Sequence, residues 1–179
     1  AIEEQLGALH SFVNFAGILR DCMLIKVKEG ALVEKMSLAQ WQAVIDVNLT
    51  GTFLCGREGA ALMAKGGQGG VIINISSIAR AGNIGQSNYA ASKAGVASLV
   101  VTWGRELARH GIRVMGIAPG VFATDMTAAM KPEAMARMQQ AIPVGALGQG
   151  EQLAQTVQFI LANDYLSGRI IDLDGGLRL

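Results

Sequence analysis

The chain has few of the residues that build metal sites and disulfide frameworks. Its 179 residues include two cysteines and two histidines. Cys22, Cys55, His10 and His110 are widely separated, whereas metal ligands usually cluster at short spacings. We therefore predict no metal ion. Two separated thiols are typical of proteins kept in a reducing compartment, so we expect a cytoplasmic location.

Charge and long hydrophobic runs are scarce as well. Charged residues make up 16% of the chain and the net charge is +1, with both signs mixed, which argues against a nucleic-acid partner. Hydrophobic residues make up 51%, yet no uninterrupted apolar run reaches the roughly 18 residues that a membrane helix requires. The apolar excess instead predicts fully buried elements, no membrane span and a contact between subunits.

Short apolar runs alternate with longer helical patterns along the chain. The predicted strands cover 9–17, 70–76, 112–120 and 168–176, and the predicted helices cover 37–67, 87–111 and 151–163. The strands are continuously apolar, which indicates a parallel sheet covered by helices on both faces. Ser37 and Gly111 fit an N-cap and a helix stop. The sequence predicts a single α/β domain over residues 1–179.

Two segments interrupt this alternation. Residues 20–36 form a charged excursion around Gly30. Residues 121–149 form a long connection that contains Met126, Met130, Met135 and Met138. We favour a lid for this connection, because it leaves the carboxyl end of a parallel strand, where ligands bind in such sheets. The alternative is a surface helix whose methionines pack onto the domain.

Tyr89 and Lys93 are four residues apart in a predicted helix, so they share one face. A lysine cation near a phenol favours the phenolate and would lower the tyrosine pKa from about 10. Such a tyrosine can transfer a proton near neutral pH. The pair alone is a weak signal, and its alternative is a core tyrosine beside a solvated lysine.

The surroundings strengthen the catalytic interpretation. Ser76 and Ser77 end the strand before this helix, where a hydroxyl can bond a substrate carbonyl. Asn48 stands in the middle of a predicted helix, where asparagine is unfavourable. The stretch "APGVFATD" (118–125) leaves the next strand through a Pro-Gly turn.

Together these stretches resemble the short-chain dehydrogenase/reductase family, over essentially the whole chain. "NFAG" (14–17) resembles its Asn-Asn-Ala-Gly turn, with Phe15 in place of the second asparagine. "NISS", "YAASK" and "PGVFAT" match its active-site strand, catalytic helix and nicotinamide-side turn. Within the family, "NYAASKAG", "GIRVMGIAPGVFATDMT" and "DLDGG" are most similar to 3-oxoacyl-acyl-carrier-protein reductases. The resemblance implies a Rossmann-like doubly wound parallel sheet.

The resemblance also implies a role for each catalytic residue. Tyr89 would be the general acid that protonates the developing alkoxide. Lys93 would lower the pKa of Tyr89 and bond the nicotinamide ribose. Ser77 would orient the carbonyl, with its neighbour Ser76 as the alternative. Asn48 would bind a water that links Lys93 to solvent.

The same resemblance implies a cofactor, NADP with NAD as an alternative, and a set of residues that bind it. Besides Tyr89 and Lys93, this set comprises Asn14, Ala16 and Gly17 on the adenosine side, and Pro119, Gly120, Val121 and Thr124 near the nicotinamide. The implied reaction moves a hydride between the nicotinamide and a carbonyl or secondary alcohol. The expected substrate is a 3-oxoacyl thioester, as a small molecule or bound to acyl-carrier protein in fatty acid biosynthesis.

The family's glycine-rich phosphate-binding turn has no counterpart in this sequence. "GGQGG" (66–70) follows a predicted helix and precedes a strand, which is the wrong order. "AIEEQLGALH" (1–10) resembles the end of the family's third helix. We therefore expect the chain to be the carboxyl-terminal portion of a longer protein, inactive alone, with the 9–14 strand at a sheet edge.

Two other functions remain open. One is a non-catalytic or truncated subunit that acts only in oligomerisation. The other is an isomerase or dehydratase that uses the same cofactor without net turnover.

A stripe of mostly small residues predicts that the 87–111 helix meets its copy in a second subunit, with the 37–67 helix alongside. The family resemblance implies a homodimer or homotetramer. The stripe consists of Ala90, Ala94, Ala97, Val101, Gly104 and Ala108. The alternative is a wider contact within one chain.

Overall fold

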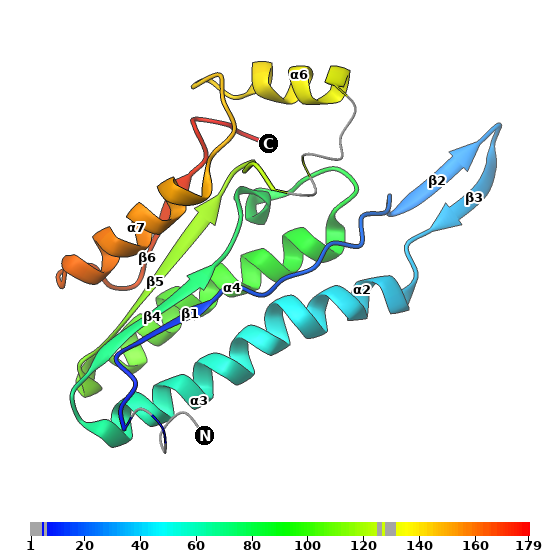
Figure 1. Cartoon of the computed structure of the whole chain (residues 1–179). Helices are drawn as coiled ribbons and strands as arrows, with labels where there is room; N and C mark the ends of the chain where they lie inside the picture. Colours follow the sequence, from blue (N-terminus) through cyan, green and yellow to red (C-terminus); the bar gives the residue numbers. More distant parts are fainter. Residues whose placement is uncertain (1–4, 6, 125–126, 128–131) are drawn as a thin grey trace.

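The sheet at the centre of the molecule consists of four parallel strands (Figure 1). The computed structural model describes residues 5, 7–124, 127 and 132–179. The strands run in the spatial order β1 (Ser11–Asn14), β4 (Gly70–Ile75), β5 (Ile112–Pro119) and β6 (Arg169–Leu173). The predicted α/β fold is confirmed. β1 and β6 are shorter than predicted, and within the described residues β1 lies at the sheet edge, as expected.

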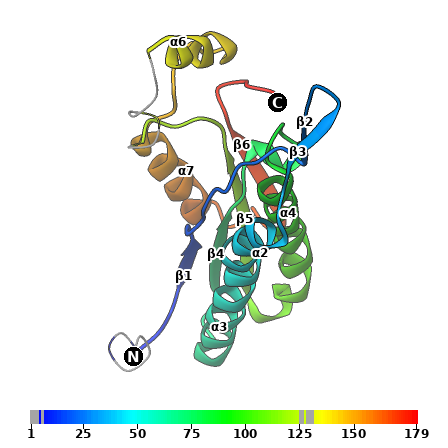
Figure 2. The ribbon, with the colours of Figure 1, turned by 90° about the vertical axis from the view of Figure 1, so that its right-hand side faces the viewer.

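Helices cover both faces of this sheet (Figures 1 and 2). On one face, α3 (Gly51–Gly66) and α4 (Ser87–Glu106) contribute Met63 and Val100 to a core around Ile72. On the other face, α7 (Gly150–Ala162) packs Ile160 against Ile73 and Met115. Side chains of successive strand residues are therefore buried on opposite faces, which explains why the central strands are continuously apolar.

The predicted 37–67 helix is divided by a π-helical turn. It runs as α2 (Leu38–Ile45), η1 (Asp46–Thr50) and α3. Ser37 caps it through a reciprocal capping box with Gln40, and Gly67 ends it in the left-handed conformation at φ 68°. The turn contains Asn48, whose buried side chain bonds the backbone of another segment. π-turns in helices frequently occur at functional sites.

The 87–111 helix ends earlier than predicted. α4 ends at Glu106 and a short 3-10 turn, η3 (Ala108–His110), follows. Gly111 then adopts the left-handed conformation at φ 69°, which confirms it as the stop signal. Val96 and Val100 of α4 are completely buried against the sheet.

The 20–36 segment forms a hairpin that projects from the body of the molecule (Figure 1). β2 (Ile25–Lys28) and β3 (Ala31–Lys35) pair antiparallel through a turn at Glu29 and Gly30, both at positive φ. Every strand residue of this hairpin is exposed.

Among its described residues, the 121–149 connection contains the helix α6 (Pro132–Ala141). Met135 and Met138 are half-buried on it, and Met126 and Met130 lie outside the described residues. The choice between a lid and a surface helix therefore stays a prediction. Among the described residues, no helix is long and apolar enough to span a bilayer, and no three potential metal-ligating side chains form a cluster.

Candidate active site

The predicted catalytic residues converge at the carboxyl end of β4. This strand leads directly into Ser76 and Ser77, and α4 begins nearby and presents Tyr89 and Lys93. Asn48 lies in η1, and the segment after β1 contacts it through Ile18. Parallel sheets bind ligands at this edge, because the strands end there and the loops can diverge.

Lys93 is almost completely buried, with 4% of its surface exposed. Its Nζ donates a hydrogen bond of 2.8 Å to the carbonyl oxygen of Ile75 and lies 5.7 Å from the ring centroid of Tyr89. Burial lowers the pKa of Lys93 to about 8, since a desolvated ammonium is less stable than a neutral amine. The ammonium has three donors, and Ile75 occupies one of them.

Tyr89 corrects one expectation drawn from the sequence. Burial raises the pKa of its phenol above the usual value of 10, a hydrogen bond with Ser77 lowers it in part, and the charge of Asp21 raises it further. The prediction that Lys93 lowers this pKa is wrong for this structure. Desolvation destabilises the phenolate by more than the Lys93 ammonium stabilises it, and that ammonium is itself desolvated.

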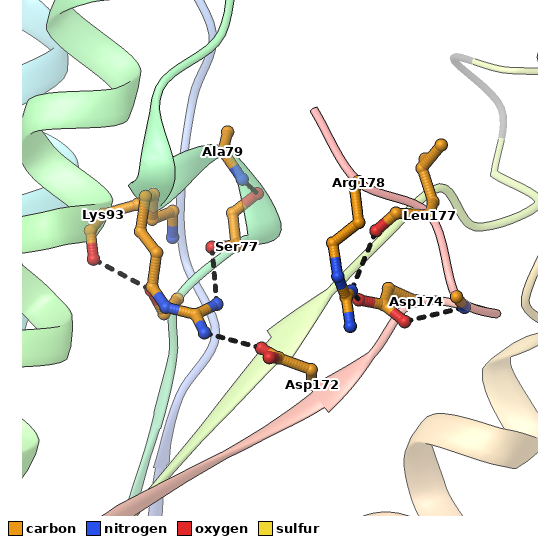
Figure 3. Close-up of polar contacts among 10 residues, drawn as sticks. Ser77, Ala79, Lys93, Asp172, Asp174, Leu177 and Arg178 are labelled. Carbon is orange, nitrogen blue, oxygen red and sulfur yellow. Dashed lines mark hydrogen bonds and ion pairs between the residues drawn. The ribbon is translucent and has the colours of Figure 1, made fainter. Parts of the chain in front are cut away.

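The two serines after β4 have different roles. Ser76 Oγ donates a hydrogen bond of 2.8 Å to the backbone carbonyl of Lys93 and thereby ties the end of β4 to α4. Ser77 Oγ accepts the backbone N–H of Ala79 at 3.1 Å, a contact drawn in Figure 3. Ser77 also lies near enough to the Tyr89 phenol to lower its pKa. Ser77, not Ser76, therefore faces the phenol.

Asn48 holds the segment that follows the "NFAG" turn. Its Oδ1 accepts the Ile18 N–H at 2.8 Å, and its Nδ2 donates to the Ile18 carbonyl at 3.0 Å and to Ser92 Oγ at 3.3 Å. This amide is fully buried. The sequence singled out this mid-helix asparagine but did not reveal its backbone partner, and the catalytic role of Asn48 stays a prediction.

Gly17 allows the chain to pass close to the side chains of Asn48 and Lys93. A Cβ at this position would lie 3.4 Å from Asn48 Oδ1 and 3.5 Å from Lys93 Nζ.

Asn14 donates a hydrogen bond of 2.8 Å to Asn74 Oδ1, while Asn74 Nδ2 is buried without a hydrogen-bond partner among the described residues. Sequence reasoning missed Asn74. Its signal was a polar residue inside an otherwise apolar strand.

The residues after β5 form a second wall at the same edge of the sheet. Gly120 N–H donates 2.9 Å to the Leu173 carbonyl, and a Cβ on Gly120 would lie 2.8 Å from Asp174 Cα. Pro119 ends β5, and the Val121 carbonyl accepts the Gly148 N–H at 3.0 Å. Thr124 and the Ala16 backbone turn are exposed. The structure describes no contact that joins these residues to Tyr89.

These features fit the ribose and nicotinamide half of a dinucleotide. Lys93 Nζ retains two donors that ribose hydroxyls would occupy, and Gly17 places no side chain beside Nζ. The described residues contain no glycine-rich turn from a strand into a helix that would hold the pyrophosphate.

Comparison with known proteins agrees with the site. A family model described as enoyl-(acyl carrier protein) reductase matches residues 1–178. The chain belongs to the short-chain dehydrogenase/reductase family. This family comprises nicotinamide-dependent oxidoreductases with a Rossmann-like fold, so the chain is an oxidoreductase by membership.

Three relatives illustrate the activities found among similar proteins. The chain is 41% identical over 178 residues to a 3-oxoacyl-(acyl-carrier-protein) reductase of Synechocystis sp., covering 97% of this chain and 67% of the relative. It is 39% identical over 179 residues to the corresponding reductase of Thermotoga maritima, covering 98% and 69%. A (3R)-3-hydroxyacyl-CoA dehydrogenase of Mus musculus is 43% identical over 168 residues, covering 92% and 61%.

Proposed function

We propose that this chain carries the proton-transfer site of an NADPH-dependent reductase that converts a 3-oxoacyl thioester into a 3-hydroxyacyl thioester. The observation that carries the proposal is that Lys93 is buried with its Nζ 5.7 Å from the Tyr89 ring centroid, while Ser77 lies near enough to the phenol to lower its pKa. The nicotinamide supplies the hydride when it is bound. The preference for NADPH over NADH rests on the family resemblance.

The residues of this chain handle the proton. Ser77 orients the substrate carbonyl by a hydrogen bond, and the Tyr89 hydroxyl donates its proton to the oxygen as the alkoxide develops. The raised pKa keeps Tyr89 protonated at neutral pH, so its proton is present for donation. Lys93 holds ribose hydroxyls and, with a pKa of about 8, can return a proton to the phenolate.

The remaining predicted site residues complete this proposal. Asn48 fixes Ile18 and thereby the turn beside Lys93, and a water near its backbone would link Lys93 to solvent. We assign Asn14, Ala16 and Gly17 to the adenosine side of the nucleotide. We assign Pro119, Gly120, Val121 and Thr124 to the nicotinamide side.

The names of the relatives support an acyl thioester as substrate. By name, two are reductases of 3-oxoacyl groups carried by acyl-carrier protein, and one is a dehydrogenase of 3-hydroxyacyl-CoA. Oxidation of the 3-hydroxyl group is the reverse of reduction of the 3-oxo group. The description of the family model names enoyl reduction instead, so reduction of a carbon–carbon double bond is the second candidate.

The test uses the protein as its gene encodes it, with NADPH and either acetoacetyl-CoA or crotonyl-CoA. We expect loss of reduced-nicotinamide absorbance with acetoacetyl-CoA and none with crotonyl-CoA. The opposite preference would establish the enoyl reaction. Conversion of a thioester without change in nicotinamide absorbance would indicate an isomerase or dehydratase. No conversion at all would support a purely oligomeric role.

A further inference from the structure

We propose that Arg80 is a positioning residue for Ser77, and that its ion pair with Asp172 holds the turn that carries Ser77 against Tyr89. The inference rests on the proposed function, because it assigns a task to a residue that does not touch the reacting atoms. Neither Arg80 nor Asp172 belongs to the predicted site. They lie on different elements, 92 residues apart in the sequence.

The Arg80 guanidinium has two partners at once. Its Nη1 donates to the Ser77 carbonyl at 3.2 Å, and its Nη2 bonds Asp172 Oδ1 at 2.7 Å. The backbone N–H of Arg80 donates to the same Ser77 carbonyl at 3.1 Å. One guanidinium therefore joins Ser77 to Asp172. Dashed lines reach both of these labelled residues in Figure 3.

The pair connects two strands that are not neighbours. Ser77 follows β4, and Asp172 lies on β6, with β5 between them. Asp172 follows Ile171 in β6, so its side chain lies on the opposite face of the sheet from Ile171 and on the same face as Ile170. Ile170 packs into the core beneath α3 and α4, and Ile171 packs into the core on the other face. Arg80 thus ties the short 3-10 turn η2 (Ile78–Ala81) to a fixed point on the sheet.

Ser77 depends on this tie because its other support is local. Its hydroxyl accepts a hydrogen bond from Ala79, which belongs to the same turn. If the turn shifts, Ser77 and Ala79 shift together, and the distance from Ser77 to Tyr89 changes. Misplacement of a catalytic group by about 1 Å can reduce a rate about 100-fold.

The geometry requires arginine in particular. A guanidinium presents several donors in a rigid plane, so one group can serve a carbonyl and a carboxylate together. A lysine ammonium is a compact charge on a flexible stem and would hold the two poorly. The Arg80 and Asp172 side chains are 24% and 40% exposed, so the ion pair by itself contributes little to stability.

The test compares Arg80→Met, Arg80→Lys and Asp172→Asn in the protein as its gene encodes it, with Arg109→Met as a matched control. Arg109 is exposed and lies on η3, at the opposite end of β5. We expect Arg80→Met to lower kcat for acetoacetyl-CoA reduction about 10- to 100-fold, with the Kd for NADPH changed less than twofold. Arg80→Lys should recover part of the loss, and Asp172→Asn should be intermediate.

A second readout distinguishes positioning from general damage. The hydrogen bond from Ser77 lowers the pKa of Tyr89, so its weakening should raise that pKa. Reduction requires the protonated phenol, so the decline in kcat at high pH should move to higher pH in Arg80→Met and stay in place in Arg109→Met. Combining Arg80→Met with Asp172→Asn should reduce kcat no further than Arg80→Met alone.

The outcomes separate this inference from the proposed function. An inactive wild type would refute the proposed function, and alkaline absorbance titration of Tyr89, as the difference from Tyr89→Phe, would still report whether Arg80→Met raises its pKa. An active wild type with an equally active Arg80→Met would overturn the positioning role. If Arg80→Met does not fold, Arg80→Lys and Asp172→Asn decide the question by the same two readouts.

Discussion

At the scale of residues, the site is a layer of buried polar groups between β4 and the helices. Asn48, Ser92 and Lys93 are each at most 4% exposed, and each has a named hydrogen-bond partner. Burying such groups is costly unless they are bonded, so the network constrains where each group lies. The backbone carbonyls of Ile18, Ile75 and Lys93 supply much of this bonding.

Tyr89→Phe tests the acid role. We expect kcat to fall by about 10² to 10⁴, because proton delivery to the alkoxide is lost, while NADPH binding is nearly unchanged. Tyr165→Phe is the matched control, since Tyr165 is 97% exposed. Steady-state rates and nucleotide titration check both. Activity within a few-fold of wild type would show that another group supplies the proton.

The burial of Lys93 predicts a pH dependence of stability. The folded-state pKa of about 8 lies below the ordinary value of 10.5, so the unfolded chain binds more protons between these values. The free energy of unfolding of wild type should therefore rise relative to Lys93→Met as the pH increases from 8 to 10. Above pH 10 the raised pKa of Tyr89 acts in the opposite direction. Urea unfolding at a series of pH values measures the difference, and a flat difference would contradict the burial effect.

At the scale of elements, glycines make room where α4 meets α3 and η1. A Cβ on Gly56 would lie 2.4 Å from the Trp103 ring, and one on Gly95 would lie 2.8 Å from Leu49. The hairpin of β2 and β3 has no comparable packing. Its apolar residues, including Ile25, remain more than half exposed. A lone two-stranded hairpin contributes little stability in water.

A matched pair of isoleucines measures this contrast. Ile72→Ala in β4 should reduce the free energy of unfolding by about 2–5 kcal/mol, because Ile72 is fully buried and a cavity remains. Ile25→Ala in β2 should change it by less than about 0.5 kcal/mol, since Ile25 is 56% exposed. Chemical denaturation of both variants tests this. Similar losses at the two positions would mean that the hairpin is packed in solution.

At the scale of the whole molecule, an apolar outer surface on α3 and α4 supports the proposed subunit contact. Phe53, Leu54 and Val101 are between 38% and 43% exposed. The predicted small-residue stripe is partly used within the chain, because a Cβ on Gly104 would lie 2.8 Å from Gly168 Cα. Ala94, Val101 and Ala108 remain exposed and are available to a second copy.

Ala97→Arg tests this assembly. Ala97 is half-buried on α4, and an arginine there would place an unpaired charge in the contact. We expect light scattering to show smaller species than wild type, while Thr102→Arg, exposed elsewhere on the same helix, leaves the mass unchanged. A monomeric wild type at micromolar concentration would exclude the contact.

Patterns in the sequence predicted the parallel sheet and its main strands and helices, and short motifs led to the four residues that we propose as catalytic. Hydrophobic continuity, helix caps and short motifs are local properties, and Ser37, Gly67 and Gly111 act within a few residues of their position. The folded chain was needed to reveal the π-turn at Asn48, the hydrogen bond from Ser76 to the Lys93 carbonyl and the bridge from Arg80 to Asp172. It also reversed the expected direction of the Tyr89 pKa. These features depend on contacts between distant segments and on the desolvation of side chains that become buried. The spacing of residues along the chain specifies neither of these.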